Sequence, residues 1–266
     1  MAQATSGHRP LALITGASAG IGREFSRQIA ARAHDVVVVA RDQARLDALA
    51  KELSAAQGTD VEVLPADLSR ASEVEQVEAR VRMTDRPIDL LVNNAGFATR
   101  GRFDELPLEG ELEEIAVNVI AVARLAHAAG GAMVDRGGGA IVNVSSLGAR
   151  QPAPSMATYA ATKAYVSSFS QALHAELASH GVHVMALEPG FTHTEFQARA
   201  KVTEVQSAVP EFMWSDPAEV VTAALADLDK RKPVSVPFWQ NKVMAAGATV
   251  LPPAVTRKLA STMLDS

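Results

Sequence analysis

The chain has 266 residues, of which 48% are hydrophobic and 21% are charged, and it contains no cysteine. These values are ordinary for a folded globular protein and exclude a disordered or low-complexity chain. The lack of cysteine excludes disulfides, thiolate nucleophiles and zinc–thiolate sites, and it suits a reducing compartment. The net charge is −5 and the basic residues are scattered, which argues against nucleic acid as a partner.

A membrane location is not expected from the sequence. The N-terminal residues lack the charged segment and long apolar stretch of a signal peptide. The most apolar long window, residues 115–134, contains Asn118, Arg124 and His127, so it is interpreted as a buried helix of a soluble protein. We therefore expect a cytoplasmic protein without membrane contact.

Short apolar segments alternate with longer helical patterns along almost the whole chain. The predicted strands are 11–14, 36–40, 61–65, 90–92, 140–144, 183–187 and 234–236. The predicted helices are 22–33, 41–57, 73–84, 108–135, 159–179 and 217–228. Most strand segments are continuous apolar runs, typical of parallel strands covered on both faces. The pattern predicts a single α/β domain over residues 1–266, a Rossmann-like doubly wound parallel sheet of about seven strands with helices on both faces.

A glycine-rich turn follows the first predicted strand. Residues 15–22 read Thr-Gly-Ala-Ser-Ala-Gly-Ile-Gly and lead into the first predicted helix. Glycine lets the backbone turn tightly and approach a pyrophosphate, whose charge then lies at the helix N-terminus. The turn predicts a dinucleotide site, although a tight turn without a ligand would look the same. Its predicted contacts are Gly16, Ser18, Gly20, Ile21 and Gly22.

The same turn also fits the G-x-S-x-G nucleophile elbow of serine hydrolases, with Ser18 as the nucleophile. In that fold the elbow follows several strands, whereas here it follows the first one. A hydrolase would also leave the later motifs without a role. We therefore prefer the dinucleotide site.

The end of the second predicted strand indicates which dinucleotide is bound. An acidic residue about 20 positions after the glycines holds the ribose 2′-hydroxyl of NAD, whereas an Arg nearby accommodates the 2′-phosphate of NADP. Here Ala40 takes the place of the acid and Arg41 follows it. Arg can bond a phosphate through two N–H groups, and Asp42 is interpreted as a helix cap. The sequence thus predicts NADP(H) in preference to NAD(H).

Further motifs follow that turn in a fixed order. They are Asn93-Asn94-Ala95-Gly96 after the fourth strand, Asn118 in the next helix, Asn143-Val144-Ser145-Ser146 at the fifth strand, Tyr159-Ala160-Ala161-Thr162-Lys163 in the following helix and Pro189-Gly190-Phe191-Thr192-His193-Thr194 after the sixth strand. With these motifs, which span about residues 9–240, the chain resembles the short-chain dehydrogenase/reductase family. The resemblance implies an oxidoreductase that transfers a hydride directly between a nicotinamide and a carbonyl or alcohol, without a metal.

Four residues are implied to be catalytic: Asn118, Ser146, Tyr159 and Lys163. Tyr159 would protonate the carbonyl oxygen or deprotonate the alcohol, and Ser146 would bond the same oxygen. Tyr159 and Lys163 are four residues apart and share a helical face, so we expect the ammonium to lower the pKa of the phenol. Lys163 would also hold the nicotinamide ribose, and Asn118 would hold the water of a proton relay. Ser145 is an alternative to Ser146, which the spacing favours.

The resemblance also implies cofactor contacts in the later loops. They are Asp67 and Leu68 after the third strand, Asn94, Ala95 and Gly96 after the fourth, Tyr159 and Lys163 in the catalytic helix, and Pro189, Gly190, Thr192 and Thr194 after the sixth. Asp67 could instead cap the next helix. No metal site is predicted, and we expect His180 and His183 to lie at the surface. His193, between the two threonines, is a weaker candidate for a substrate contact.

The substrate is expected to depend on segment 191–215, whose many apolar residues favour an apolar carbonyl or alcohol. The apolar tail, residues 238–266, is expected to pack over the substrate cleft or on a second subunit. The resemblance implies a homodimer or a homotetramer. An NADP-binding sensor or scaffold without turnover is the alternative function. Such a protein would be expected to lack the Tyr or the Lys, and here Ser146, Tyr159 and Lys163 are all present.

Overall fold

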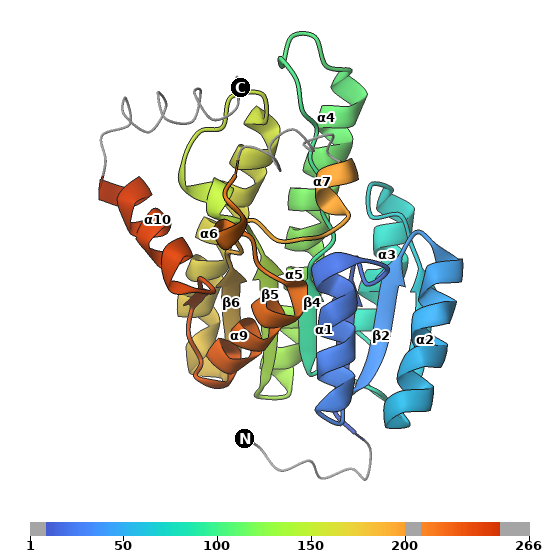
Figure 1. The fold of residues 1–266 in the computed structure, drawn as a ribbon. Helices are drawn as coiled ribbons and strands as arrows, with labels where there is room; N and C mark the ends of the chain where they lie inside the picture. Colours follow the sequence, from blue (N-terminus) through green and yellow to red (C-terminus); the bar gives the residue numbers. More distant parts are fainter. Residues whose placement is uncertain (1–8, 200–208, 251–266) are drawn as a thin grey trace.

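A parallel sheet forms the centre of the protein, and the computed structural model describes residues 9–199 and 209–250 around it (Figure 1). The strands are β1 (Leu11–Thr15), β2 (Asp35–Ala40), β3 (Val61–Pro65), β4 (Leu90–Asn93), β5 (Gly139–Val144), β6 (Val182–Leu187) and β7 (Val234–Ser235). Their order in the seven-stranded sheet is β3-β2-β1-β4-β5-β6-β7. In β1, Ile14 pairs with Val38 of β2 on one side and with Val92 of β4 on the other.

Helices cover both faces of this sheet because the strands are apolar on both faces. One face packs against α1 (Gly20–Ala31), α2 (Gln43–Gln57) and α9 (Pro217–Asp229). The other packs against α3 (Ala71–Val81), α5 (Val122–Asp135) and α6 (Ala157–Leu177). Three further helices, α4 (Leu108–Ile115), α7 (Phe196–Arg199) and α10 (Trp239–Val250), complete the described part of the chain. The predicted fold class is therefore confirmed.

Side-chain caps fix where two of these helices begin. Asp42 accepts a hydrogen bond of 3.0 Å from the backbone N–H of Arg45, as expected for the cap of α2. Asp216 accepts one of 2.7 Å from the N–H of Ala218, and Pro217 takes the first helical position of α9. The helix that follows the second strand therefore begins just after Arg41, which leaves the Arg41 side chain at the strand end.

The long helix predicted over 108–135 is interrupted. Residues Ala116–Ala121 form a π-helical turn between α4 and α5. Such turns are frequent at functional sites, and this one contains Asn118. By length and composition the stretch Leu108–Asp135 could span a membrane, and half of its most apolar window is buried within the protein. Its α5 part forms one layer of the core.

The prediction that His183 lies at the surface is wrong. Its side chain is 2% exposed because β6 lies inside the sheet, between β5 and β7, and is covered by α6. The His183 ring meets the edge of the His174 ring, with their centroids 5.2 Å apart. His180 is exposed as expected. In the described ranges no group of three or more His, Asp or Glu side chains is arranged to hold a metal ion.

The tail predicted over 238–266 begins as α10, and residues 251–266 lie outside the described part of the chain. Helix α10 packs near the loop that follows β5 and leaves Trp239 and Val243 exposed. Its Asn241 is 2% exposed and donates a hydrogen bond of 2.9 Å to the carbonyl of Pro237. The tail thus starts next to the C-terminal edge of the sheet, where the predicted site residues lie.

Candidate active site

The predicted site residues gather where the parallel strands end, as expected for an open α/β sheet. The glycine turn follows β1, Asn94 follows β4, and Ser146 follows β5. Helix α4 and the short α7 stand at the same edge in Figure 1. The site is therefore assembled from loops that are far apart in the sequence but start from adjacent strands.

The glycine turn needs glycine at three of its positions. Gly16 and Gly20 have φ of +66° and +50°, a conformation that other residues rarely adopt. A Cβ on Gly22 would lie 2.4 Å from both the Gly16 carbonyl oxygen and the Asn94 Nδ2. The side chain of Asn94 therefore occupies the room next to the turn. This close packing keeps the backbone of the turn in one shape.

Thr15 links this turn to the loop that follows β4. Its hydroxyl oxygen accepts hydrogen bonds of 3.0 Å from the backbone N–H groups of both Asn94 and Ala95. In return, Asn94 Nδ2 donates a bond of 2.9 Å to the Thr15 carbonyl. Thr15 is not among the site residues predicted from the sequence. Its position directly before Gly16, at the end of a predicted strand, is the signal that could have identified it.

Among the described residues, Ser18 has none of the partners that a hydrolase nucleophile needs. A nucleophilic Ser is hydrogen-bonded to a His that is oriented by a carboxylate. Within residues 9–199 and 209–250, no His or carboxylate is hydrogen-bonded to the Ser18 hydroxyl. His193, which lies near the turn, contacts Glu211 instead, at 3.2 Å. The geometry thus gives the hydrolase alternative no support.

Arg41 and Asp67 lie together at the ends of β2 and β3. Arg41 is 72% exposed, and its Nη1 lies 4.0 Å from Asp67 Oδ2. Burial opposes ionisation of Asp67, but hydrogen bonds from Ser69 and the charges of Arg41 and Arg70 hold its pKa below the usual value. Asp67 accepts bonds of 3.0 and 2.8 Å from Ser69 and does not cap α3. The Asp67 side chain thus shapes the turn.

Leu68, the next predicted contact, has its side chain packed in the core. A cofactor could therefore meet only the Leu68 backbone.

Ser146, Tyr159 and Lys163 converge at the end of β5. Ser146 Oγ accepts a bond of 3.0 Å from the Gly148 N–H and lies near enough to Tyr159 to lower the pKa of its phenol. Lys163 Nζ donates a bond of 2.9 Å to the Val144 carbonyl and lies 5.8 Å from the centre of the Tyr159 ring. The phenol, hydroxyl and ammonium that the sequence predicted thus share one small volume.

The expected lowering of the Tyr159 pKa by Lys163 is wrong for this structure. Burial raises the pKa of Tyr159 to about 12, while the hydrogen bond with Ser146 lowers it and the charge of Glu114 raises it further. Burial also lowers the pKa of Lys163 to about 8, and Glu114 opposes that change. Desolvation dominates both groups because it disfavours whichever form is charged. Sequence spacing predicted their proximity but not their burial.

Ser145, the alternative to Ser146, points away from Tyr159. Its hydroxyl donates a bond of 2.7 Å to the Lys163 carbonyl and lies 2.8 Å from the Ser167 Oγ. Ser167 in turn donates to Glu188, which is 1% exposed and paired with Arg150 at 2.6 Å. Ser145 therefore belongs to a buried hydrogen-bond network with Ser167 and Glu188 and not to the group around Tyr159.

The Asn118 side chain is fully engaged and is 0% exposed. Its Oδ1 accepts a bond of 3.2 Å from the Phe97 N–H, and its Nδ2 donates bonds of 2.9 and 3.1 Å to the Phe97 carbonyl and Thr162 Oγ1. It therefore ties the loop after β4 to α6. Both side-chain N–H groups already have partners, and the relay water expected at this residue stays a prediction.

The loop after β6 places the remaining predicted contacts. Gly190 packs so closely on Asn241 that an added Cβ would lie 2.5 Å from Asn241 Oδ1. Thr192 is 4% exposed and donates a bond of 3.0 Å to the Gly190 carbonyl. Thr194 lies over the glycine turn, since a Cβ on Gly20 would lie 3.1 Å from Thr194 Cβ. The loop thus closes over the turn that follows β1.

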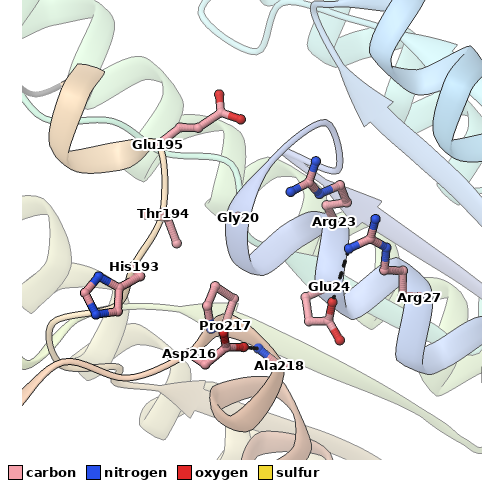
Figure 2. A pocket seen from close by; sticks show the side chains of 10 residues that line it. All are labelled: Gly20, Arg23, Glu24, Arg27, His193, Thr194, Glu195, Asp216, Pro217 and Ala218. Carbon is pink, nitrogen blue, oxygen red and sulfur yellow. Dashed lines mark hydrogen bonds and ion pairs between the residues drawn. The ribbon is translucent and has the colours of Figure 1, made fainter.

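A cavity of about 500 Å³ opens on the outer side of this contact, between the N-terminal ends of α1 and α9 (Figure 2). It is lined by Gly20, Arg23, Glu24, Arg27, His193, Thr194, Glu195, Asp216, Pro217 and Ala218. Figure 2 shows charged side chains of both signs around it. Ser146, Tyr159 and Lys163 do not line it. It therefore adjoins the dinucleotide turn but is not the reaction centre.

Comparison with known proteins decides the family. The model of the short-chain dehydrogenase family matches residues 10–204. The chain belongs to the short-chain dehydrogenase family. It is therefore an oxidoreductase that acts on CH–OH and C=O groups.

Individual relatives agree with this membership. A short-chain dehydrogenase from Sphingobium yanoikuyae in complex with NADPH is 40% identical, with a TM-score of 0.82 over 97% of this chain and 96% of that one. A bulky-bulky ketone specific alcohol dehydrogenase from Comamonas testosteroni is 33% identical, with a TM-score of 0.77 over 92% and 96%. A very-long-chain 3-oxoacyl-CoA reductase from Phaeosphaeria nodorum is 30% identical over 243 residues, or 88% of this chain and 69% of that protein.

Proposed function

We propose that this dehydrogenase uses NADP(H) to interconvert an apolar ketone or aldehyde and its alcohol, with Tyr159 as the acid and base. The observation that carries the proposal is the convergence of Ser146, Tyr159 and Lys163 at the end of β5. A nearby hydroxyl donor and a cation help a phenol to act on a carbonyl oxygen, because they stabilise the charges that develop there. The three groups stand in that relation here.

The residues around the turn fit a dinucleotide. Gly16, Gly20 and Gly22 leave no side chain between the backbone and a pyrophosphate, and Gly20 and Gly22 lie in the first turn of α1, at its N-terminus. Gly96 faces Lys163, since a Cβ there would lie 3.3 Å from Lys163 Nζ. The bound nicotinamide would supply or accept the hydride.

The residues proposed to bind the dinucleotide come from the glycine turn, the strand ends, α6 and the loop after β6. They are Gly16, Ser18, Gly20, Ile21, Gly22, Arg41, Asp67, Leu68, Asn94, Ala95, Gly96, Tyr159, Lys163, Pro189, Gly190, Thr192 and Thr194.

The protein's own groups carry the proton chemistry. In reduction, the Tyr159 hydroxyl gives its proton to the carbonyl oxygen, and Ser146 donates a hydrogen bond to the same oxygen as charge develops on it. In oxidation, the Tyr159 phenolate takes the proton of the alcohol. Because burial raises the pKa of Tyr159 to about 12, the phenol is the resting form. Lys163, held by the Val144 carbonyl, is placed to stabilise the phenolate.

Preference for NADP(H) over NAD(H) rests on Arg41. Its guanidinium is 72% exposed at the end of β2, where an acidic residue would repel a 2′-phosphate. Asp42, the nearest acid in sequence, is committed to the cap of α2. The relative from Sphingobium yanoikuyae, in complex with NADPH, supports the same preference.

An apolar substrate is supported by the surroundings of Tyr159. Tyr159 packs with Met156 and Phe196 against the buried Ala98, and the Phe196 ring centre lies 5.5 Å from that of Tyr159. These groups offer a carbonyl compound apolar contacts and no charge. The relative from Comamonas testosteroni is named for bulky ketones, which agrees with such a lining.

We also propose a cytoplasmic homo-oligomer in which a second copy covers α4. Leu108, Leu112 and Ile115 lie on one face of that helix and are 58%, 55% and 36% exposed. Apolar side chains grouped in this way favour an interface. Sedimentation of Leu112→Lys beside the wild type tests the assembly, which should fall to a smaller species. Cell fractionation tests the location.

The function is tested by following NADPH oxidation with a panel of aryl and alkyl ketones and aldehydes, acetophenone among them. Parallel assays use NADH and an ester-hydrolysis control. Turnover on carbonyl compounds that Tyr159→Phe abolishes, while NADPH still binds, is the expected result. Binding of NADPH without turnover across the panel would favour a sensor or scaffold. Activity on esters alone would favour the hydrolase with Ser18.

A further inference from the structure

Two buried carboxyl groups lie directly behind the reaction centre. Glu111 and Glu114 of α4 are 3% and 0% exposed, although both are charged residue types that rarely lie in a core. Glu114 precedes Asn118 by one helical turn, and its charge acts on both Tyr159 and Lys163.

A single hydroxyl joins the two groups. Thr99 Oγ1 lies 2.5 Å from Glu111 Oε1 and 2.7 Å from Glu114 Oε2. A threonine hydroxyl has one hydrogen, so it can donate to only one of these oxygens. The other contact is a hydrogen bond only if that carboxyl group carries a proton and donates it to Thr99. One proton shared between the two glutamates would make both contacts hydrogen bonds.

The surrounding contacts indicate which group holds the proton. Glu111 accepts from the hydroxyls of both Thr99 and Thr158, and two O–H donors stabilise a carboxylate. Glu114 Oε2 accepts a bond of 2.7 Å from the Thr99 N–H beside its contact with the Thr99 hydroxyl. The two carboxyl groups differ at the other oxygen of Glu114. Within the described part of the chain, Glu114 Oε1 is buried and has no hydrogen-bond partner. Leaving that oxygen unpartnered is far less unfavourable if Glu114 is neutral.

We propose that Glu114 is a positioning residue for the Tyr159–Lys163 pair, kept neutral by the proton that it shares with Glu111 through Thr99. This inference rests on the proposed function, in which Tyr159 is the acid and base. An ionised Glu114 would oppose the Tyr159 phenolate, since its charge raises the pKa of Tyr159. The shared proton removes that charge and lets the phenolate form next to Lys163.

Electrostatics of the neighbouring groups agree with this assignment. Burial raises the pKa of Glu114, and the charge of Glu111 raises it further, while Thr99 and Lys163 lower it. The groups that face Glu114 are thus Glu111 on its own helix and Lys163 and Tyr159 on α6. Removing Glu111 should make Glu114 easier to ionise. Replacing Glu114 by Gln should keep the site neutral at every pH.

The first test needs no turnover. Infrared difference spectra of the purified protein at neutral pH should contain the C=O stretching band of a protonated carboxylic acid, shifted in D₂O. The band should disappear in Glu114→Gln, titrate at lower pH in Glu111→Gln, and persist in Glu113→Gln. Glu113 is the matched control because it is an exposed glutamate of the same helix. If the wild type has no such band at neutral pH, the shared proton is refuted.

The second test is the pH profile of NADP⁺-dependent oxidation of 1-phenylethanol. Its rise with pH reports formation of the phenolate. In Glu111→Gln the midpoint should move up by roughly half a pH unit or more, as expected when a like charge appears near the phenol. In Glu114→Gln it should not move up. If both variants move it in the same direction, the positioning role is overturned. A wild type without oxidation activity would refute the proposed function, while the infrared band would still decide the shared proton.

Discussion

Arg41 separates recognition of the cofactor from the chemistry, so its replacement by Ala is the sharpest test of the NADP(H) preference. The guanidinium is 72% exposed, and its ion-pair partner, Asp67, lies 4.0 Å away. The residue that follows it caps α2 through its own side chain. Arg41→Ala therefore removes a charge at the strand end while leaving the glycine turn, α2 and Tyr159 intact.

The size of the effect follows from that exposure. Hydrogen bonds to charged groups contribute about 1.5–3 kcal/mol. Solvent around Arg41 places this one at the lower end, since exposed ion pairs are screened. A loss of about 1.5 kcal/mol corresponds to roughly a tenfold weaker Kd for NADPH. Binding of NADH, which has no 2′-phosphate, should hardly change.

The assay is a fluorescence titration of both cofactors with the wild type, Arg41→Ala and a control that has the same change in charge. Arg32→Ala is suited to that control, because Arg32 lies just beyond the C-terminal end of α1 and pairs with Asp229 at 3.0 Å. It should leave both affinities unchanged. Equal losses for NADPH and NADH in Arg41→Ala, or a wild type that prefers NADH, would refute the interpretation of the second strand.

Four further changes test other parts of the structure. Tyr159→Phe should lower turnover by about 10²-fold or more and leave the affinity for NADPH unchanged, because acid–base catalysis contributes a factor of about 10²–10⁴. Stopped-flow kinetics measures the turnover, and titration with NADPH measures the affinity. Gly22→Ala should lower the free energy of unfolding in urea by about 1–3 kcal/mol through overpacking, whereas Gly131→Ala, which has open space around it, should not. Arg150→Met should lower the free energy of unfolding by about 3 kcal/mol, since the substitution leaves the buried Glu188 carboxylate without its ionic partner. His183→Leu should reduce the amount by which the free energy of unfolding falls between pH 7 and pH 5.5.

The fold could be predicted from the sequence because its signals are local. Val36–Val39 is a continuous β-branched run, and such a run is favourable only in a strand with both faces covered. Asp216, Pro217 and Asp42 mark helix starts through chemistry that involves only their close neighbours in the chain. The order of the motifs then placed Ser146, Tyr159 and Lys163 at one edge of the sheet.

What could not be predicted depends on contacts between distant segments. On a helical pattern Glu111 and Glu114 resemble solvent-facing residues, and only the approach of Thr99 and Thr158 gives them buried partners. The π-helical turn likewise contains Asn118, whose side chain bonds Phe97 and Thr162, 21 and 44 positions away. Burial, which sets the protonation of Tyr159, is a property of the assembled layers.

His183 shows how such burial makes stability depend on pH. Burial lowers its pKa to about 4, and the charges of Arg231 and His174 lower it further, whereas an unfolded His titrates near 6.5. Between these values the unfolded chain binds a proton that the folded chain does not. The contribution of His183 is therefore complete above pH 6.5 and is lost as the pH falls towards 4. At pH 5.5 the loss is about 1.4 kcal/mol.

Urea unfolding at pH 7 and pH 5.5 measures this loss. The wild type should lose about 1.2 kcal/mol more than His183→Leu over that interval, since Leu cannot bind the proton that the unfolded His binds. His180→Leu is the matched control, because His180 is exposed and its replacement should leave the pH dependence of the wild type. Should His183→Leu and the wild type lose the same stability, the buried ring would not be the source of the acid sensitivity.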